Sequence, residues 1–288
     1  MKGRQVFKDT LHQKHFEKYG FVKVAFLPSE KIEELKKSYQ KLTKQPLATG
    51  FHSTMNYPDH NYRRQTDEAI KGIVRESINK FLESYRPLFA NFIVKEAQPE
   101  SAVNIHQDWN YVDEEKHVSV NIWCPLTETN LQNGALWVLP GSHRLKTPPR
   151  FTPHKPPRWE RFNDTITELS IPVQTSLGEA IIYHPGVIHF SKPNFSQKPR
   201  IAVAFVNIPI ETTALHYFRA NEQSPELEVF EVNDDFFNRM ELGKRPEGVE
   251  KTGTLPLDES HFSKEELLSL QRLYPVSYTH LRAHETRR

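Results

Sequence analysis

Hydrophobic and polar positions divide the chain into two parts with different periods. In the N-terminal part, apolar residues recur every three or four positions, which is the spacing of a helix with one buried face. Residues 29–42 and 66–89 carry this pattern, and Ser29 and Thr66 stand where helix N-caps are expected. In the same part, residues 20–27 (GFVKVAFL) predict a strand, and residues 49–65 predict a polar loop.

From residue 91 to residue 209 the apolar positions fall into short runs of the kind that form strands. Turn-forming residues separate these runs, and no helical pattern lies between them. Eight such strands predict a mainly β fold, an antiparallel jelly roll with the N-terminal helices against one outer face. The predicted strands are FIVKEA, SAVNIHQDW, HVSVNIWCPL, ALWVL, ITELSIPV, EAIIYH, VIHFS and RIAVAFVNI.

One interruption of this pattern is long. Residues 144–165, RLKTPPRFTPHKPPRWERFNDT, hold too many prolines to continue a sheet. A loop of this length in a compact domain usually serves a function or lacks order. Two interpretations stay open: a basic, semi-rigid flap beside the mouth of the barrel, or a surface excursion without a role.

The C-terminal part is polar and mixed. Residues 226–240 carry an amphipathic signal, and residues 263–274 predict a final helix that opens with a capping box of Ser263 and Glu266.

The last residues differ in character from the rest. The stretch PVSYTHLRAHET, which begins at Pro275, resembles a translated sequencing adapter, so residues 275–288 are excluded from the interpretation. We therefore expect a single domain at residues 1–274, with its β-rich core at about residues 90–209.

Composition narrows the classes of function. The chain has 288 residues, and its 38 basic and 36 acidic side chains form no long block of one sign, which argues against a nucleic-acid-binding or membrane-binding surface. Cys124 is the single cysteine and the first residues lack the apolar core of a signal peptide, so a reducing, cytoplasmic setting is expected. No apolar run approaches the ~20 residues of a membrane span. The chain contains no G-x-G-x-x-G motif, which argues against a nucleotide-binding fold.

The segment NIHQDWNYVDEEKH places His106 and Asp108 two positions apart. Residues i and i+2 of a strand face the same side, so one face offers a nitrogen and an oxygen ligand. A metal site needs a third ligand from a strand distant in sequence, and GEAIIYHPGVIHF supplies His184 and His189. Either histidine would complete a set of two imidazoles and one carboxylate with open coordination positions, as in non-haem Fe(II) oxygenases.

Arg200 opens the strand that follows His189, after a loop that makes the two strands candidate hairpin neighbours. An arginine inside a barrel needs a partner, because an unpaired buried charge is destabilising. A small dicarboxylate is a suitable partner, since one end chelates the metal while the other pairs with the guanidinium.

Together these segments resemble the phytanoyl-CoA dioxygenase family of Fe(II)- and 2-oxoglutarate-dependent oxygenases. The resemblance runs from about Tyr19 to Pro209 and includes the family's opening strand and helix. The matching pieces are HQD at 106–108, NIWCPL at 121–126, NGALWVLPGSH at 133–143, and GVIHFSKPN with KPRIAVAF between Gly186 and Phe205.

The resemblance implies a double-stranded β-helix with His106, Asp108 and His189 as the iron ligands, which makes His184 a neighbouring polar residue. It also implies that Arg200 holds the distal carboxylate of 2-oxoglutarate.

Further residues are implied around the cosubstrate. The resemblance places the hydroxyl of Ser191 near the same carboxylate and Trp123 in the wall of the pocket, and Asn121 shares the facing of Trp123 by strand alternation. Lys95 either points into the pocket and helps to hold a carboxylate or is a solvated charge. Residues 109–111, WNY, either line the substrate mouth or pack in the core.

The resemblance implies an enzyme that uses Fe(II), 2-oxoglutarate and dioxygen to hydroxylate an unactivated C–H bond, releasing succinate and carbon dioxide. The family name points to acyl or lipid-like substrates, whereas its members act on diverse small molecules. Relatives that halogenate carry a small residue in place of the carboxylate, so Asp108 favours hydroxylation or another oxidation. The alternative is a non-catalytic, cupin-like protein that binds a metal or small ligand, but the open ligand set argues against it.

Overall fold

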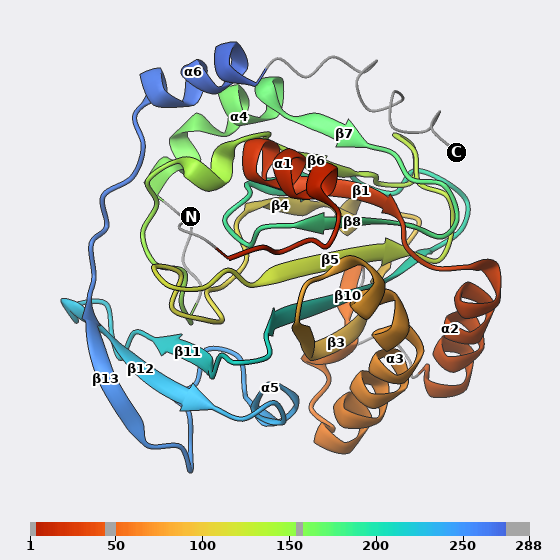
Figure 1. Ribbon diagram of the computed structural model, residues 1–288, viewed down its shortest axis with the longest axis horizontal. Coiled ribbons are helices and arrows are strands. Elements are labelled where there is room, and N and C mark those ends of the chain that lie inside the picture. Colours follow the sequence, from red (N-terminus) through yellow and green to blue (C-terminus); the bar gives the residue numbers. More distant parts are fainter. Residues whose placement is uncertain (1–3, 44–49, 154–157, 275–288) are drawn as a thin grey trace.

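The computed structural model of the chain describes residues 4–43, 50–153 and 158–274 (Figure 1). The adapter-like stretch from Pro275 lies outside the described residues, as do residues 154–157 of the predicted flap. No helix within the described ranges combines the length and hydrophobicity that a bilayer crossing requires.

Two antiparallel sheets form the centre of the fold and confirm the predicted jelly roll (Figure 1). The larger sheet has six strands in the order β1-β8-β5-β10-β3-β2, and the smaller has four in the order β4-β9-β6-β7. Neighbouring strands are distant in sequence, so residues from separate motifs meet in the interior. The larger sheet contains β1 (Phe21–Ala25), β8 (Glu179–Tyr183), β5 (Val120–Pro125), β10 (Arg200–Pro209), β3 (Tyr85–Lys95) and β2 (Phe51–Ser53), and the smaller contains β4 (Val103–His106), β9 (His189–Ser191), β6 (Leu136–Val138) and β7 (Ile171–Val173).

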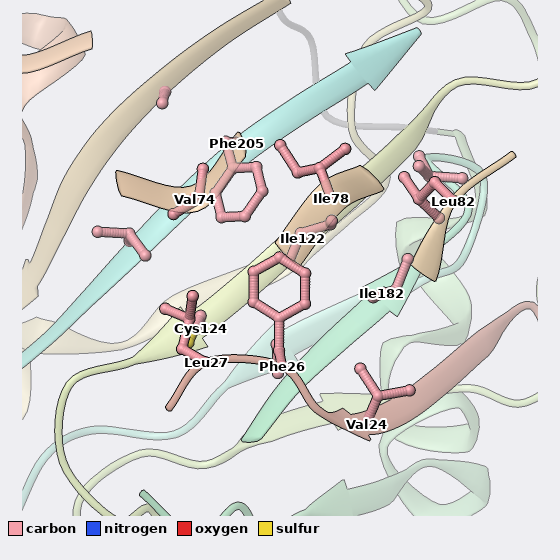
Figure 2. Packing of buried hydrophobic residues seen from close by; sticks show 14 of the residues in the cluster. Val24, Phe26, Leu27, Val74, Ile78, Leu82, Ile122, Cys124, Ile182 and Phe205 are labelled. Atoms are coloured by element: carbon pink, nitrogen blue, oxygen red, sulfur yellow. The ribbon is translucent and has the colours of Figure 1, made fainter. Parts of the chain in front are cut away.

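Helices pack on the outer face of the larger sheet. The apolar stripe of α3, which includes Val74 and Ile78, lies against Ile122 of β5 and Phe205 of β10 (Figure 2). Because alternate residues of these strands face the helices, the others are free to face the barrel interior. The three N-terminal helices are α1 (Thr10–Tyr19), α2 (Ser29–Leu42) and α3 (His60–Phe81).

The predicted helices exist, but both predicted N-caps are wrong, and residues 85–89, predicted as the end of the second helix, begin β3 because Pro87 does not fit a helix interior. Helix α2 already includes Ser29, and Pro28 is its N-cap residue. Helix α3 begins at His60, where the side chain of Asp59 accepts a hydrogen bond from the backbone N–H of Tyr62 (3.1 Å). Of the predicted polar loop, residues 60–65 therefore belong to this helix, and residues 51–53 and 54–56 form β2 and a short 3-10 helix.

Other elements were mispredicted or not predicted. The ITEL part of the predicted strand ITELSIPV forms helix α4 (Asn163–Leu169), and only its end forms β7. A third sheet, in the order β11-β12-β13, follows β10 (Figure 1). It consists of β11 (Ala214–Phe218), β12 (Glu226–Val232) and β13 (Lys251–Pro256), and residues 226–240 thus contain a strand and the short helix α5 (Phe236–Arg239).

The predicted final helix is confirmed as α6 (Lys264–Leu273), and Ser263 and Glu266 form the capping box. Short 3-10 helices within the described residues are η1 (Thr54–Asn56), η2 (Pro99–Ser101), η3 (Ser142–Arg144) and η4 (Arg158–Phe162).

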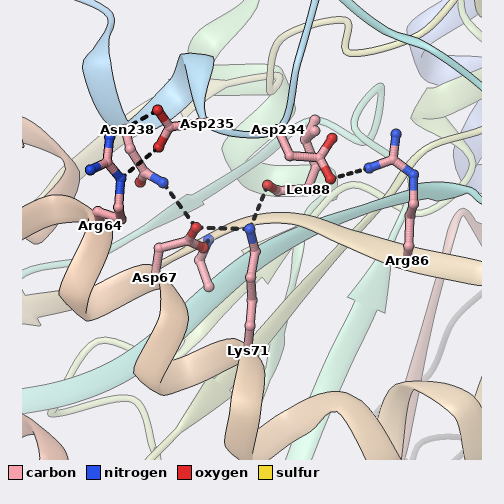
Figure 3. Close-up of polar contacts among 9 residues, drawn as sticks. Arg64, Asp67, Lys71, Arg86, Leu88, Asp234, Asp235 and Asn238 are labelled. Carbon is pink, nitrogen blue, oxygen red and sulfur yellow. Dashed lines mark hydrogen bonds and ion pairs between the residues drawn. The ribbon is translucent and has the colours of Figure 1, made fainter.

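A buried carboxylate ties α3 to the larger sheet and to α5. Asp67, 3% exposed, accepts hydrogen bonds from the backbone N–H of Ala90 (2.7 Å), from Lys71 Nζ (2.8 Å) and from Asn238 Nδ2 (2.9 Å) (Figure 3). Lys71 also donates to the carbonyl of Leu88 (2.8 Å). Burial raises the pKa of Asp67, and the Lys71 ammonium opposes that rise.

Replacing Asp67 with alanine is expected to lower the free energy of unfolding by about 3 kcal/mol, because it removes the acceptor of a buried backbone N–H, of Asn238 Nδ2 and of one of the two hydrogen bonds of Lys71. Urea unfolding followed by circular dichroism measures the change. Arg64→Gln is the control, since the ion pair of Arg64 with Asp235 lies at the surface of the same helix, and little change is expected there. Equal destabilisation by the two variants would contradict the prediction.

Candidate active site

His106, Asp108 and His189 come together between two neighbouring strands of the smaller sheet. His106 ends β4, Asp108 follows it, and His189 begins β9, where the register pairs His106 with His189. One ligand atom from each of the three residues lies within 4.8 Å of the other two. The sequence-predicted pair and the distant histidine therefore form one group that could hold a metal ion.

Both histidines direct Nε2 toward the carboxylate of Asp108. Nδ1 of His106 lies 2.8 Å from the carbonyl oxygen of Asn104, and Nδ1 of His189 lies 2.8 Å from that of Val187. A carbonyl only accepts, so each Nδ1 carries the proton and each Nε2 is free to bind a metal. Nε2 of His106 and of His189 lie 3.5 Å and 3.7 Å from the carboxylate of Asp108.

The carboxylate of Asp108 is held from the opposite side. Oδ2 accepts hydrogen bonds from the hydroxyl of Tyr183 (3.0 Å) and from Nδ2 of Asn121, and the backbone N–H of Asp108 donates to the carbonyl of Pro185 (3.0 Å). Burial alone would raise the pKa of Asp108, but the neighbouring His189 and His106 hold it below its usual range.

Burial and the neighbouring His106 lower the pKa of His189 to about 4. Its imidazole is therefore neutral near pH 7, which is the form that binds a metal.

The predicted flap reaches this group through Arg150. Its Nε donates to the backbone carbonyl of Asp108, its backbone N–H donates to Oδ1 of Asn110 (2.7 Å), and its guanidinium pairs with Glu114. Thr152 forms a parallel β-bridge with Phe218, so the same segment also joins the third sheet. The flap is therefore attached on one side to the residues that follow the histidine–carboxylate pair.

Arg200 lies inside the barrel, 3% exposed, at the start of β10. Its Nη1 donates to the carbonyl of Gly134 (2.8 Å), its guanidinium carbon lies 5.0 Å from the ring centre of Trp123, and its Nε has no hydrogen-bond partner among the described residues. Burial lowers its pKa to about 9. No carboxylate in the described part of the chain forms an ion pair with it.

A cavity of about 500 Å³ joins these residues. It is lined by the three candidate metal ligands and by the residues that the sequence placed around the cosubstrate, namely Arg200, Ser191, Trp123 and Asn121. Trp109 and Tyr111 also line it, whereas the side chain of Asn110 holds the flap. One pocket thus contains a potential metal site and a buried cation without an acidic partner.

Lys95 occupies neither of the two positions considered for it. Its side chain is fully buried and its ammonium donates to the carbonyls of Ser101 and Lys192, the latter at 3.0 Å, so it is not among the residues that line the cavity. Burial and the neighbouring Arg200 lower its pKa to about 7. Gly134 makes room for it, since a Cβ there would lie 2.5 Å from Cδ of Lys95.

His184 lies outside the group. Its Nδ1 accepts a hydrogen bond from the backbone N–H of Gly186 (2.9 Å), and its ring packs near His143 with 5.5 Å between centroids. Burial lowers the pKa of His184 to about 3. Burial also lowers the pKa of His143 to about 3, so both imidazoles are neutral near pH 7, and neither belongs to the group that could hold a metal ion.

Two functional contacts were missed in the sequence. Tyr183 pairs with Asn121 in the register of β8 and β5, so strand alternation in EAIIYH could have placed its hydroxyl inside the barrel. Arg150 lies in a loop without periodicity, and no pattern there indicates that it reaches Asp108.

Comparisons with known proteins identify relatives of the chain in sequence and in fold. The chain is 27% identical to a zebrafish protein named Phytanoyl-CoA dioxygenase domain-containing protein 1 over 162 residues, which are 52% of this chain and 56% of that protein. The matched part thus spans about half of that relative's length.

Two solved structures share the fold. The non-haem, alpha ketoglutarate dependent carbocyclase SnoK from nogalamycin biosynthesis aligns with a TM-score of 0.53 and 16% identity, over 83% of this chain and 94% of its own. The epimerase SnoN, in complex with Fe3+, alpha ketoglutarate and nogalamycin RO, aligns with a TM-score of 0.51 and 16% identity, over 70% and 83%.

The sequence model described as Phytanoyl-CoA dioxygenase (PhyH) matches residues 16–202, which include all three candidate ligands and Arg200. The chain therefore belongs to the phytanoyl-CoA dioxygenase family.

Proposed function

We propose that the chain is an Fe(II)- and 2-oxoglutarate-dependent dioxygenase that hydroxylates an unactivated C–H bond of a small-molecule or acyl/lipid-like substrate, with release of succinate and carbon dioxide. One observation carries the proposal. The same cavity contains the histidine–aspartate–histidine group and Arg200, which forms no ion pair with a carboxylate of the described residues. We also propose that residues 1–274 form a single domain. The lone cysteine, Cys124, supports a cytoplasmic setting for the protein.

The residues present fit the iron and the cosubstrate. Two imidazoles and a carboxylate are a ligand set for Fe(II) that leaves coordination positions open. The unpartnered Nε of Arg200 is a buried donor that suits a carboxylate at the far end of a dicarboxylic acid. The SnoN complex, which contains Fe3+ and alpha ketoglutarate on the same fold, supports this assignment.

In this proposal the iron supplies the redox chemistry with dioxygen and 2-oxoglutarate, and the protein supplies binding and orientation. His106, Asp108 and His189 would hold the metal, with Tyr183 and Asn121 fixing the carboxylate. Arg200 would hold the far carboxylate of 2-oxoglutarate, with Ser191 and Trp123 beside it in the cavity wall.

The test is succinate release from 2-oxoglutarate by the purified chain with and without Fe(II) under air. Turnover that requires added Fe(II) and is lost with a chelator supports the enzyme. If the chain binds metal and 2-oxoglutarate but releases no succinate with any member of a broad substrate panel, the cupin-like binding protein is the better description.

Arg150→Gln is expected to weaken metal binding about tenfold, the lower end of the usual effect of residues that orient metal ligands. The variant removes the donor to the carbonyl of Asp108 and the ion pair with Glu114. Titration with Co(II), followed by visible absorption, measures the affinity directly. Arg219→Gln is the matched control, because that arginine pairs with Glu259 and with the carbonyls of its own loop. An unchanged affinity in Arg150→Gln would show that the flap does not position Asp108.

A further inference from the structure

The cavity extends beyond the candidate metal ligands into a chamber with an apolar wall. The wall contains Met55 after β2, Phe89 of β3, Trp109 and Tyr111 after the histidine–carboxylate pair, and Val206 of β10. Phe89 and Tyr111 pack with 5.5 Å between ring centroids, which makes this wall continuous. We call this part of the cavity the substrate chamber, since the proposed function assigns the remainder to iron and 2-oxoglutarate.

In the proposed function, every charged or imidazole side chain of the described cavity lining binds either the iron or 2-oxoglutarate. Its acidic, basic and imidazole side chains are those of His106, Asp108, His189 and Arg200. The nearby Lys95 donates to two carbonyls and does not line the cavity. A charged group that entered the chamber would lose its water without gaining a partner of opposite sign, which is strongly unfavourable. The chamber therefore selects an uncharged group.

Asn91 is the one buried side-chain amide of the described cavity lining that makes no hydrogen bond, since those of Gln107 and Asn121 both donate one. Asn91 lies on β3, opposite Ala204 of β10, whose other neighbour is Trp123 of β5. It is 8% exposed, lines the cavity, and its amide makes no hydrogen bond with the described residues, its Oδ1 being buried and unpartnered. The other buried asparagine of the lining, Asn121, also has an unpartnered Oδ1, but its Nδ2 donates to Asp108 and thereby fixes its orientation.

An unpaired buried amide is destabilising, so such a group in a cavity indicates a ligand that completes its hydrogen bonds. The amide can rotate to offer either its oxygen or its NH2 group, so it can serve a hydroxyl or an amide. The neighbours of Asn91 on the same face of β3, Phe89 and Ile93, are apolar and offer no competing contact.

We propose that the substrate presents to the chamber an uncharged, largely apolar group with one hydroxyl or amide function, which hydrogen-bonds to Asn91. This inference rests on the proposed function, because that function assigns Arg200 to 2-oxoglutarate and thereby removes it as a partner of the substrate.

Four probes of matched shape separate charge from hydrogen bonding: toluene, benzyl alcohol, benzoate and benzylammonium. Their dissociation constants are measured by ligand-observed NMR on the full chain with Zn(II) and saturating 2-oxoglutarate, which keeps benzoate away from Arg200. Benzyl alcohol is expected to bind about fivefold more tightly than toluene, the effect of one neutral hydrogen bond, and neither ion is expected to bind measurably.

Asn91→Leu is expected to remove the preference for benzyl alcohol over toluene while keeping the affinity for toluene within twofold. Asn56→Leu is the matched control, because Asn56 also lines the cavity but is exposed to solvent, and the preference is expected to persist there. Thermal unfolding of both variants establishes that they fold.

The inference is overturned if either ion binds more tightly than benzyl alcohol, if none of the four probes binds, or if Asn91→Leu keeps the preference. Failure of the proposed function is a separate result, visible as absent metal or 2-oxoglutarate binding in a titration without probes. In that event the comparison of toluene with benzyl alcohol, run on the chain alone, still reports on Asn91.

Discussion

Replacing Asp108 with alanine is expected to abolish Fe(II)-dependent succinate release and to lower metal affinity by more than the ~10–100-fold that residues beside a ligand typically contribute. Asp108 is the single carboxylate of the candidate ligand group, so the variant leaves only the two imidazoles as ligands. It also leaves the hydroxyl of Tyr183 and Nδ2 of Asn121 without their acceptor. Co(II) titration and a succinate assay measure the two effects independently.

Asp113→Ala is the matched control for this experiment. Asp113 lies in the same segment, pairs with Lys116 at 2.7 Å, and is not among the residues that line the cavity. Its replacement is expected to leave both metal affinity and turnover within twofold of the unchanged chain. Full activity in Asp108→Ala would remove Asp108 from the ligand set, and with it the proposed reaction.

The interior of the barrel was predictable because its signals are local and repeated. Alternation along β5 puts Asn121 and Trp123 on the cavity side and Ile122 and Cys124 on the helix side, as the sequence indicates. The pairing of β4 with β9, which joins His106 to His189, is not visible in any periodicity. The choice of His189 over His184 came from the family resemblance, and it is His189 that lies beside His106 and Asp108 in the structure.

The mispredicted elements share a physical cause. Residues 163–169 form a single short helix that buries Ile166 alone, and one buried position defines neither a helical nor a strand period. In the third sheet, β13 has no buried residue, so its pairing with β12 lacks a hydrophobic signal. Arg150 in the candidate site was also not predictable from a hydrophobic pattern, because its contacts are to a backbone carbonyl and to one glutamate.

Lys95 shows how burial changes the meaning of a charged residue. A strand lysine is usually exposed, yet Lys95 is paired in register with Arg200, and both basic side chains are buried inside the barrel without an acidic partner among the described residues. Backbone carbonyls satisfy the ammonium of Lys95. The excess positive potential that remains favours an anion at Arg200, which is what a dicarboxylate cosubstrate would supply.

Replacing Arg200 with leucine is expected to raise the KM for 2-oxoglutarate by about 100-fold, within the 2–5 kcal/mol range for removal of one member of a buried charge pair. Arg200→Lys is expected to recover only part of the affinity, because a lysine cannot reproduce the two parallel hydrogen bonds of a guanidinium. Calorimetric titration of the Zn(II)-loaded protein with 2-oxoglutarate measures binding without turnover.

This variant separates the cosubstrate from the metal. Arg200 contacts Gly134 and Trp123 and none of the three candidate ligands, so the Co(II) affinity of Arg200→Leu should match that of the unchanged chain. Loss of both affinities together would mean that the substitution disturbs the barrel, and Arg200→Met, which keeps most of the side-chain volume, then distinguishes packing from charge. A normal affinity for 2-oxoglutarate in folded Arg200→Leu and Arg200→Met would exclude Arg200 as the carboxylate partner, and the buried cation would need another anion.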